Sequence, residues 1–375
     1  MKKVLAIALC CAMVFSVSAC SSDSSNNTET TVSSTSANTD TTSNTEATIS
    51  TEEIKTHIEN AIKKNKFEGI VYLTKNGSVV YESATGKDEK ENDLTVGSNM
   101  YIGSLSKQFC ATAIMMLKEQ GKLSVDDTLD KYFPEYQYGE KITIKNLLTM
   151  RSGIVNTTPE TTFLNDISDE ITVKTITDCV FKQPLNFEPD TSFEYSNSNY
   201  FLLACIVEQV SGQNYNDFLR KNIFEPLEMT NTGFVSEVKD NPKWADGFDF
   251  NKINFGELLE KFSDDKKILL LKGAGDISSN AYDMDKWMRC LVSGKVISKD
   301  SYKEMSQNYT TEQAMQYGYG LIKMYNGVGH TGSVFTYTSL NYINENQGYN
   351  LFIINNVNYQ KLMQLTTDII YGFIL

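Results

Sequence analysis

The sequence contains only two histidines, His57 and His330, among its 375 residues. No His-x-x-x-His pair or cysteine cluster accompanies them, so a zinc centre lacks its ligands. A Ser-His-Asp hydrolase is also disfavoured, because one of these two histidines would have to be the base and no Gly-x-Ser-x-Gly elbow is present. We therefore expect a protein that uses neither a metal ion nor a cofactor.

Cysteine pairs of the C-x-x-C type are missing as well. After the N-terminal region only Cys110, Cys179, Cys205 and Cys290 remain, mostly within apolar runs. This placement favours buried cysteines without a disulfide over a cross-link or a catalytic thiol.

Basic residues are fewer than acidic residues. The chain has 34 Lys and Arg against 47 Asp and Glu, a formal net charge of −13. A chain of this sign repels phosphate backbones, so we expect no nucleic-acid partner.

The first nineteen residues have the pattern of a secretory signal peptide. Lys2 and Lys3 precede a short apolar run, and small residues lead to Cys20. The run is too short for a stable membrane span. A cysteine at this place resembles the lipobox of bacterial lipoproteins, so we expect removal of residues 1–19 and lipidation of Cys20; ordinary cleavage beside an incidental cysteine is the alternative.

Residues 20–50 are predicted to be a tether. After Cys20 they are almost entirely Ser, Thr, Asn, Asp and Glu, without an aromatic residue. Such a segment buries too little apolar surface to offset its ordering entropy, and thirty residues reach roughly 30 Å. We expect a domain held by a lipid anchor at the extracellular face of a bacterial cell membrane.

Residues 51–375 form the predicted hydrolase domain. Strand signals occur near both of its ends, and Asn76-Gly77 is typical of a hairpin turn. The expected strands are 69–73, 79–81, 317–324, 337–343 and 349–355, and the clearest expected helices are 54–64, 105–120, 200–210, 215–223 and 361–374.

This order predicts an α/β (α+β) fold, in which an antiparallel sheet from the N- and C-terminal segments is flanked by helices. An all-helical lobe, about residues 123–291, is inserted into the α/β lobe of about 51–122 and 292–375. The two lobes should create a cleft where they meet.

Ser104-Leu105-Ser106-Lys107 opens the first strong helix. A serine and a lysine three residues apart share a helix face. The lysine is useful as a base only if burial and nearby positive charge depress its pKa, and N–H groups at a helix start can stabilise an oxyanion. The spacing alone is a weak signal, because it also occurs at Ser236 and Lys239 and at Ser263 and Lys266.

Two further sequence patterns contain polar side chains that could take part in catalysis or binding. Tyr195-Ser196-Asn197 supplies a phenol that can pass a proton beside a lysine, and an amide that both donates and accepts. His330-Thr331-Gly332-Ser333 lies in a glycine-rich stretch where backbone can approach a ligand closely.

These three patterns, in this order, resemble the Ser-x-x-Lys, Tyr-x-Asn and Lys/His-Thr-Gly motifs of the beta-lactamase-related serine hydrolases. This penicillin-binding-protein-like family includes class C beta-lactamases, D-alanyl-D-alanine carboxypeptidases and esterases. Further similar blocks, which extend the resemblance over about 67–375, are 101–103, 121–127, 142–149, 152–153 and 273–279.

The resemblance implies a beta-lactamase/transpeptidase-like fold and a role for each motif residue. Ser104 would form the acyl-enzyme, and Lys107 and Tyr195 would handle protons. Asn197 would hold the acyl-side amide. The four residues of the third motif would bind substrate, with His330 and Thr331 facing a carboxylate, and the amides of Ser104 and Ser333 would form the oxyanion hole.

Two positions depart from the family pattern. His330 stands where lysine is usual, which weakens permanent positive charge for a carboxylate and favours peptidase or esterase work. Met150-Arg151 stands where the family usually has His/Tyr-Thr; a solvated Arg151 is favoured over one that supplies charge to the cleft.

The expected function is acyl transfer to water, on D-alanyl peptides or esters, small esters or beta-lactams. Loops around 157–169 and 244–262 should shape the pocket that selects among them. A non-catalytic penicillin-binding sensor or wall-binding lipoprotein of the same fold is an alternative, and a solute-binding lipoprotein is a third.

Overall fold

A seven-stranded antiparallel sheet dominates the computed structural model, which describes residues 49–156, 170–234, 237, 241–247, 264–310, 315–357 and 360–373. The strand order is β2-β1-β10-β9-β8-β7-β6. The strands are β1 (Gly69–Lys75), β2 (Ser78–Thr85), β6 (Gln316–Tyr317), β7 (Ile322–Met324), β8 (Gly327–Val334), β9 (Tyr337–Asn344) and β10 (Tyr349–Asn355). The predicted fold class is confirmed, because strands from both ends of the domain share one antiparallel sheet.

The N-terminal hairpin joins the C-terminal strands directly. Asn76 and Gly77 connect β1 and β2 with φ angles of 52° and 82°, the positive values that a type I′ turn requires. β1 then pairs with β10, in the register Ile70 to Ile354. Every residue of β10 is buried, as expected for a strand covered on both faces.

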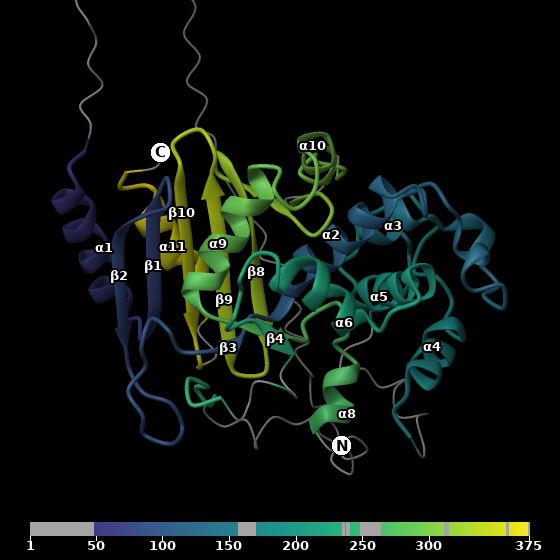
Figure 1. Ribbon diagram of the computed structural model, residues 1–375, viewed down its shortest axis with the longest axis horizontal. Coiled ribbons are helices and arrows are strands. Elements are labelled where there is room, and N and C mark those ends of the chain that lie inside the picture. Colours follow the sequence, from purple (N-terminus) through teal and green to yellow (C-terminus); the bar gives the residue numbers. More distant parts are fainter. Residues whose placement is uncertain are drawn as a thin grey trace, which may run out of the picture. The chain divides into compact units, whose positions relative to one another are not determined.

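Helices cover the two faces of this sheet (Figure 1). α1 (Thr51–Asn65) and α11 (Leu362–Ile370) pack together on one face, and α9 (Ala281–Val292) lies on the other, against β1, β9 and β10. α1 starts at a capping box formed by Ser50 and Glu53 and buries Ile54, Ile58 and Ala61. Their i, i+4, i+7 spacing places them on one side of the helix.

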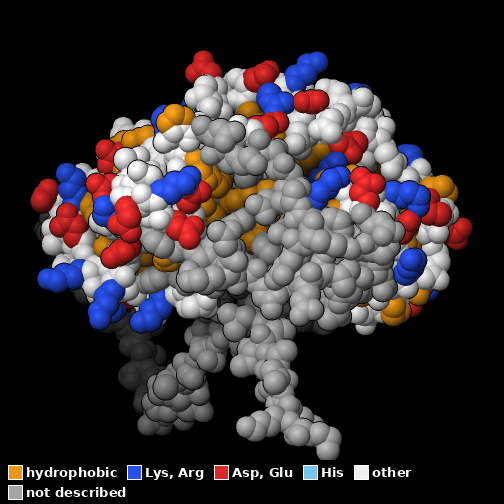
Figure 2. Space-filling view, turned by 90° about the horizontal axis from the view of Figure 1, so that it is seen from below, with side chains coloured by type: hydrophobic (Ala, Val, Ile, Leu, Met, Phe, Trp, Pro, Cys, Tyr) orange, Lys and Arg blue, Asp and Glu red, His pale blue; other side chains and the backbone are white. Residues whose placement is uncertain are grey.

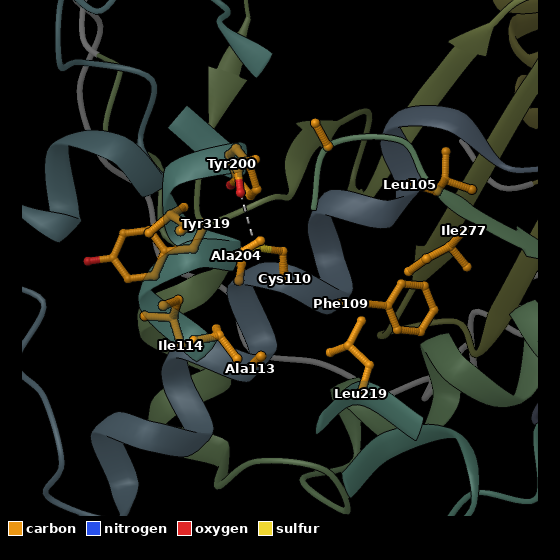
Figure 3. Close-up of a cluster of buried hydrophobic side chains, with 14 of the residues drawn as sticks. Leu105, Phe109, Cys110, Ala113, Ile114, Tyr200, Ala204, Leu219, Ile277 and Tyr319 are labelled. Carbon is orange, nitrogen blue, oxygen red and sulfur yellow. Dashed lines mark hydrogen bonds between the residues drawn. The ribbon is translucent and has the colours of Figure 1, made fainter. Parts of the chain in front are cut away.

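Beside the sheet, α2 (Ser106–Glu119) and α5 (Asn197–Ser211) pack against each other. The division into two lobes stays a prediction, because residues 50–375 form one compact unit. Figure 3 shows Cys110 and Ala113 of α2 beside Tyr200 and Ala204 of α5 in the apolar core. The remaining helices are α3 (Ile144–Leu148), α4 (Val173–Phe181), α6 (Tyr215–Leu219), α8 (Asp264–Leu269) and α10 (Lys299–Met305), with single 3₁₀ turns at Leu129–Lys131 and Gly139–Lys141 and a π-turn at Arg220–Phe224.

A small three-stranded sheet was not expected from the sequence. β5 (Ile277–Ser279) pairs with both β3 (Met100–Tyr101) and β4 (Gly233–Phe234). Strands of two or three residues are too short to show an alternation of apolar and polar residues, so the sequence pattern could not predict this sheet. It matters for the site, because β3 leads directly into Ser104.

Charges of both signs are mixed over the face in Figure 2, with hydrophobic side chains near its centre. Among the described residues, no helix is long and apolar enough to cross a membrane. The predicted signal peptide, Cys20 and most of the tether lie outside the described residues.

Gly332 of β8 sets how closely the sheet approaches the Ser104 turn. A Cβ added at Gly332 would lie 2.2 Å from the Ile102 carbonyl oxygen and 2.4 Å from Ser339 Oγ. Gly332→Ala should therefore lower the free energy of unfolding by about 1–3 kcal/mol, measured by urea denaturation. Gly97→Ala is the control, because its Cβ would meet its nearest neighbour at 3.7 Å; equal stability of the two variants would refute this account.

Candidate active site

Ser104 lies in a single 3₁₀ turn, Gly103–Leu105, immediately before α2. Strands on both sides fix this turn. The Ile102 N–H donates to the Ile277 carbonyl oxygen at 3.1 Å, and Ser339 Oγ donates to the Ile102 carbonyl oxygen at 2.8 Å. Ser104 itself is partly exposed, as a nucleophile that meets a substrate must be.

The Lys107 side chain, whose exposed fraction is 0%, points at Ser104. Its Nζ donates to Ser104 Oγ at 3.0 Å, Asn197 Oδ1 at 2.7 Å and the Ala274 carbonyl oxygen at 2.7 Å. An ammonium group has three donors, so these acceptors satisfy it. The Nζ also lies 4.8 Å from the centre of the Tyr195 ring.

Burial lowers the pKa of the Lys107 amine to about 7. At neutral pH much of the amine is then uncharged and able to accept the Ser104 proton. From the sequence, burial and a nearby positive charge were expected to act together. Burial is the dominant cause here, and Cys110 and the Asp276 carboxyl act in the opposite direction.

Asn197 is the first residue of α5, and Tyr195 precedes it by two residues. The Asn197 N–H donates to Asn156 Oδ1 at 2.7 Å, and Ser198 Oγ donates to the Val155 carbonyl oxygen at 2.6 Å. These bonds attach the chain at 155–156 to the start of α5. The second motif is thereby held beside Lys107.

His330 is buried, with 1% of its surface exposed. Its Nδ1 lies 2.6 Å from the Thr331 carbonyl oxygen, and its Nε2 lies 3.1 Å from Tyr317 Oη. A carbonyl oxygen only accepts, so the proton sits on Nδ1 and Nε2 accepts from the phenol. Burial, helped by the charge of Lys107, lowers the pKa of His330 to about 3.

A neutral, inward-facing His330 has no positive charge with which to hold a carboxylate at neutral pH. In the same motif, Thr331 is partly exposed and the Ser333 side chain is exposed. This geometry favours Thr331 over His330 as the residue that contacts a substrate.

The third motif lies directly beside the serine turn. A Cβ built on Gly103 would lie 3.0 Å from the Ser333 backbone nitrogen, so the Ser333 amide lies next to the turn that carries the Ser104 amide. Such a pair of amides is what an oxyanion hole needs. The roles assigned to these amides stay predictions.

Several contacts of the site carried no readable signal in the sequence. Ala274 lies in the 273–279 block, but nothing in the block indicated that its carbonyl accepts from Lys107. Tyr317, the partner of His330, was placed only as a strand residue. Such contacts depend on residues far apart in the chain meeting in space.

Arg151 has an acidic partner of its own. Arg151 forms an ion pair with Asp190 at 2.7 Å, and its side chain is 16% exposed, so it is more buried than expected. The predicted pocket loop 157–169 and most of 244–262 lie outside the described residues, as do Ser236, Lys239 and Ser263.

Cys110, Cys179, Cys205 and Cys290, the cysteines of the described residues, are all buried and none forms a disulfide. Burial raises the pKa of Cys110, one turn beyond Lys107, and keeps it a thiol. The described residues also contain no cluster of three or more His, Cys, Asp or Glu able to hold a metal ion.

Two solved structures share this fold. The D-amino acid amidase from Ochrobactrum anthropi SV3 has a TM-score of 0.69 at 22% identity, over 86% of this chain and 98% of that one. FmtA from Staphylococcus aureus has a TM-score of 0.70 at 22% identity, over 87% and 91%. At these identities the likeness shows the fold.

The sequence comparisons go further. The family model described as Beta-lactamase matches residues 54–368. The putative penicillin-binding protein PbpX of Bacillus subtilis (strain 168) is 30% identical over 329 residues, which are 85% of this chain and 79% of that protein. The chain therefore belongs to the beta-lactamase family of serine hydrolases.

Proposed function

We propose that this protein is a serine acyl hydrolase in which Ser104 becomes acylated and water then releases the acid. The observation that carries the proposal is the fully buried Lys107 amine, 3.0 Å from Ser104 Oγ. A buried amine with a pKa near neutrality is a general base for a hydroxyl, whereas His330 has both ring nitrogens engaged with Tyr317 and Thr331.

In the proposed reaction the Lys107 amine takes the hydroxyl proton as Ser104 Oγ bonds to the substrate carbonyl carbon. The amides of Ser104 and Ser333 stabilise the negative oxygen. Tyr195 passes a proton to the leaving alcohol or amine as the bond to it breaks. Water then attacks the ester with its proton taken by the same groups, and Ser104 leaves with its proton restored.

We propose D-amino-acyl esters and amides, such as D-alanyl esters, as the preferred substrates. Neutral His330 provides no cation for a terminal carboxylate, which disfavours D-alanyl-D-alanine peptides and beta-lactams relative to esters and amides. One protein of the same fold is a D-amino acid amidase, and a relative is a putative penicillin-binding protein.

We place this activity at the outer face of a bacterial membrane, held by a lipid on Cys20. The support is the basic start, short apolar run and small residues that precede Cys20. A diacylglyceryl anchor with its two chains binds a bilayer stably.

Ser104→Ala should abolish turnover by about 10⁴-fold or more, because the nucleophile is lost. The measurement is intact mass and product formation with a D-alanyl ester, a D-alanyl-D-alanine peptide, a D-amino acid amide and a cephalosporin. Turnover that survives in Ser104→Ala refutes the mechanism. A penicillin label that persists on wild type through a long chase, without turnover of any of these compounds, identifies a sensor instead.

The acylation rate should rise about tenfold per pH unit below pH 7 and level off above it. The sign follows because only the unprotonated Lys107 amine accepts a proton, and the pKa of Lys107 is about 7. Lys107→Arg keeps a positive charge at every working pH and should acylate slowly throughout. The check is single-turnover kinetics with an activated ester whose leaving group does not titrate; a rate that does not vary between pH 5 and 9 in wild type contradicts the assignment.

Cys20→Ser should move the protein from the membrane fraction to the soluble fraction of a bacterium that makes lipoproteins, because the lipidated thiol is gone. Immunoblots of the two fractions measure this, with Cys10→Ser, inside the signal segment, as the control. Membrane retention of Cys20→Ser would show that the anchor lies elsewhere.

A further inference from the structure

A second buried ionisable group lies in the loop whose Ala274 carbonyl contacts Lys107. Asp276 is 4% exposed and ends the loop 273–276, just before β5. Its Oδ2 accepts from the Gly273 N–H at 3.2 Å. Its Oδ1 has no hydrogen-bond partner in the part of the chain that the structure describes, although a buried carboxylate oxygen without a partner is costly.

The loop that Asp276 closes is tightly held. The N–H groups of Ala274 and Gly275 both donate to the Leu271 carbonyl oxygen at 2.8 Å. A Cβ on Gly273 would lie 2.6 Å from the Tyr200 carbonyl oxygen, so the loop fits closely against α5. The bond between Gly273 and Asp276 spans the loop from its first residue to its last.

This same loop carries the third acceptor of the catalytic amine. Ala274, between the two residues that the bond joins, points its carbonyl oxygen at Lys107 Nζ from 2.7 Å. Ile277, the residue after Asp276, donates its N–H to Ser106 Oγ at 3.2 Å. This bond ties the loop to the start of α2. A shift of the loop would move the amine relative to Ser104.

We propose that Asp276 is a positioning residue of the site, which closes the loop that holds the Ala274 carbonyl against the Lys107 amine. The inference rests on the proposed function of Lys107 as a base.

The charge balance around Asp276 involves four elements. The titratable groups that influence it or its neighbours are Lys107 and Cys110 of α2, Glu208 of α5, Tyr215 of α6, and Lys272 of the loop segment. Burial raises the pKa of the Cys110 thiol and of the Tyr215 phenol, which stay neutral. Lys272 forms an ion pair with Glu208 at 2.7 Å. Among these groups, Lys107 is therefore the cation that forms no ion pair.

Burial also raises the pKa of Asp276 to about 7, the range in which Lys107 loses its proton. The carboxyl is therefore mostly neutral in the pH range in which Lys107 is protonated, so the inference concerns the loop that Asp276 closes and not its charge.

Two variants separate position from charge. Asp276→Asn keeps an oxygen that accepts from the Gly273 N–H but removes the charge, whereas Asp276→Ala removes both. The matched control is Asp285→Asn, because Asp285 is also buried and accepts from Thr74 Oγ1 and Asn350 Nδ2 in the α9–sheet interface.

The experiment measures two quantities from pH 5 to 9 in the full chain. One is the rate of Ser104 labelling by a fluorophosphonate, followed by intact mass. The other is the ¹³Cε shift of Lys107 in lysine-labelled protein, assigned by comparison with Lys107→Arg. The second readout needs no substrate and no turnover.

Asp276→Asn should leave the plateau rate of labelling and the titration midpoint of Lys107 close to those of wild type, because it keeps the acceptor that closes the loop. Asp276→Ala should lower the plateau rate about tenfold or more, as expected when a catalytic group is misplaced, and should lower the Lys107 midpoint because the protonated amine loses an acceptor. Asp285→Asn should change neither quantity. An Asp276→Ala variant with the plateau rate and midpoint of wild type overturns the inference; if Asp276→Ala does not fold, a tenfold lower plateau rate in Asp276→Asn overturns it.

The two proposals fail separately. If wild type is not labelled at Ser104 while the Lys107 midpoint differs between Asp276→Ala and wild type, the hydrolase proposal is wrong and the link between Asp276 and Lys107 stands. If labelling follows the pH profile of Lys107 but the plateau rate and the midpoint are the same in wild type and Asp276→Ala, the hydrolase proposal stands and Asp276 has no part in it.

Discussion

The site depends on one constraint, the burial of an amine. A lysine in water keeps its proton at neutral pH and cannot act as a base. At position 107 the side chain is removed from solvent entirely, and burial brings its pKa down to about 7. The cost of burying the charged form is offset by three acceptors placed around the Nζ, which come from the serine turn, the start of α5 and the 273–276 loop.

The rest of the fold can be understood as what keeps those three acceptors in place. The serine turn is held between β5 and β9 by the bonds of Ile102. α5 packs along α2, as Figure 3 shows, and brings Asn197 with it. The sheet that supports the third motif needs strands from both ends of the domain, since β8 and β9 are joined through β10 to β1. A disturbance at any of these places reaches the amine.

Burial also determines the charge of His330, and with it what the third motif can bind. Read in sequence, a histidine in place of lysine is a weaker cation that changes with pH. In the fold both ring nitrogens have hydrogen-bond partners and the ring is buried away from solvent. His330 is therefore a neutral side chain that forms hydrogen bonds inside the protein. The positive charge that the motif usually supplies is therefore absent at this position, and the substrate must be recognised in another way.

Local patterns determined a large part of this protein from sequence alone. The Asn76-Gly77 turn, the main strands and helices, and the i, i+3 relation of Ser104 to Lys107 depend on backbone geometry within a few residues, which is why the sequence predicts them. The order of the motifs was enough to indicate the family. Tertiary structure alone decided the rest: the exclusion of solvent from Lys107, the inward, neutral His330, the short β3-β5-β4 sheet, and the contact of the 273–276 loop with the amine. These depend on contacts such as that of Lys107 with Ala274, 167 residues away, and no local pattern encodes the burial or the pKa that such contacts produce.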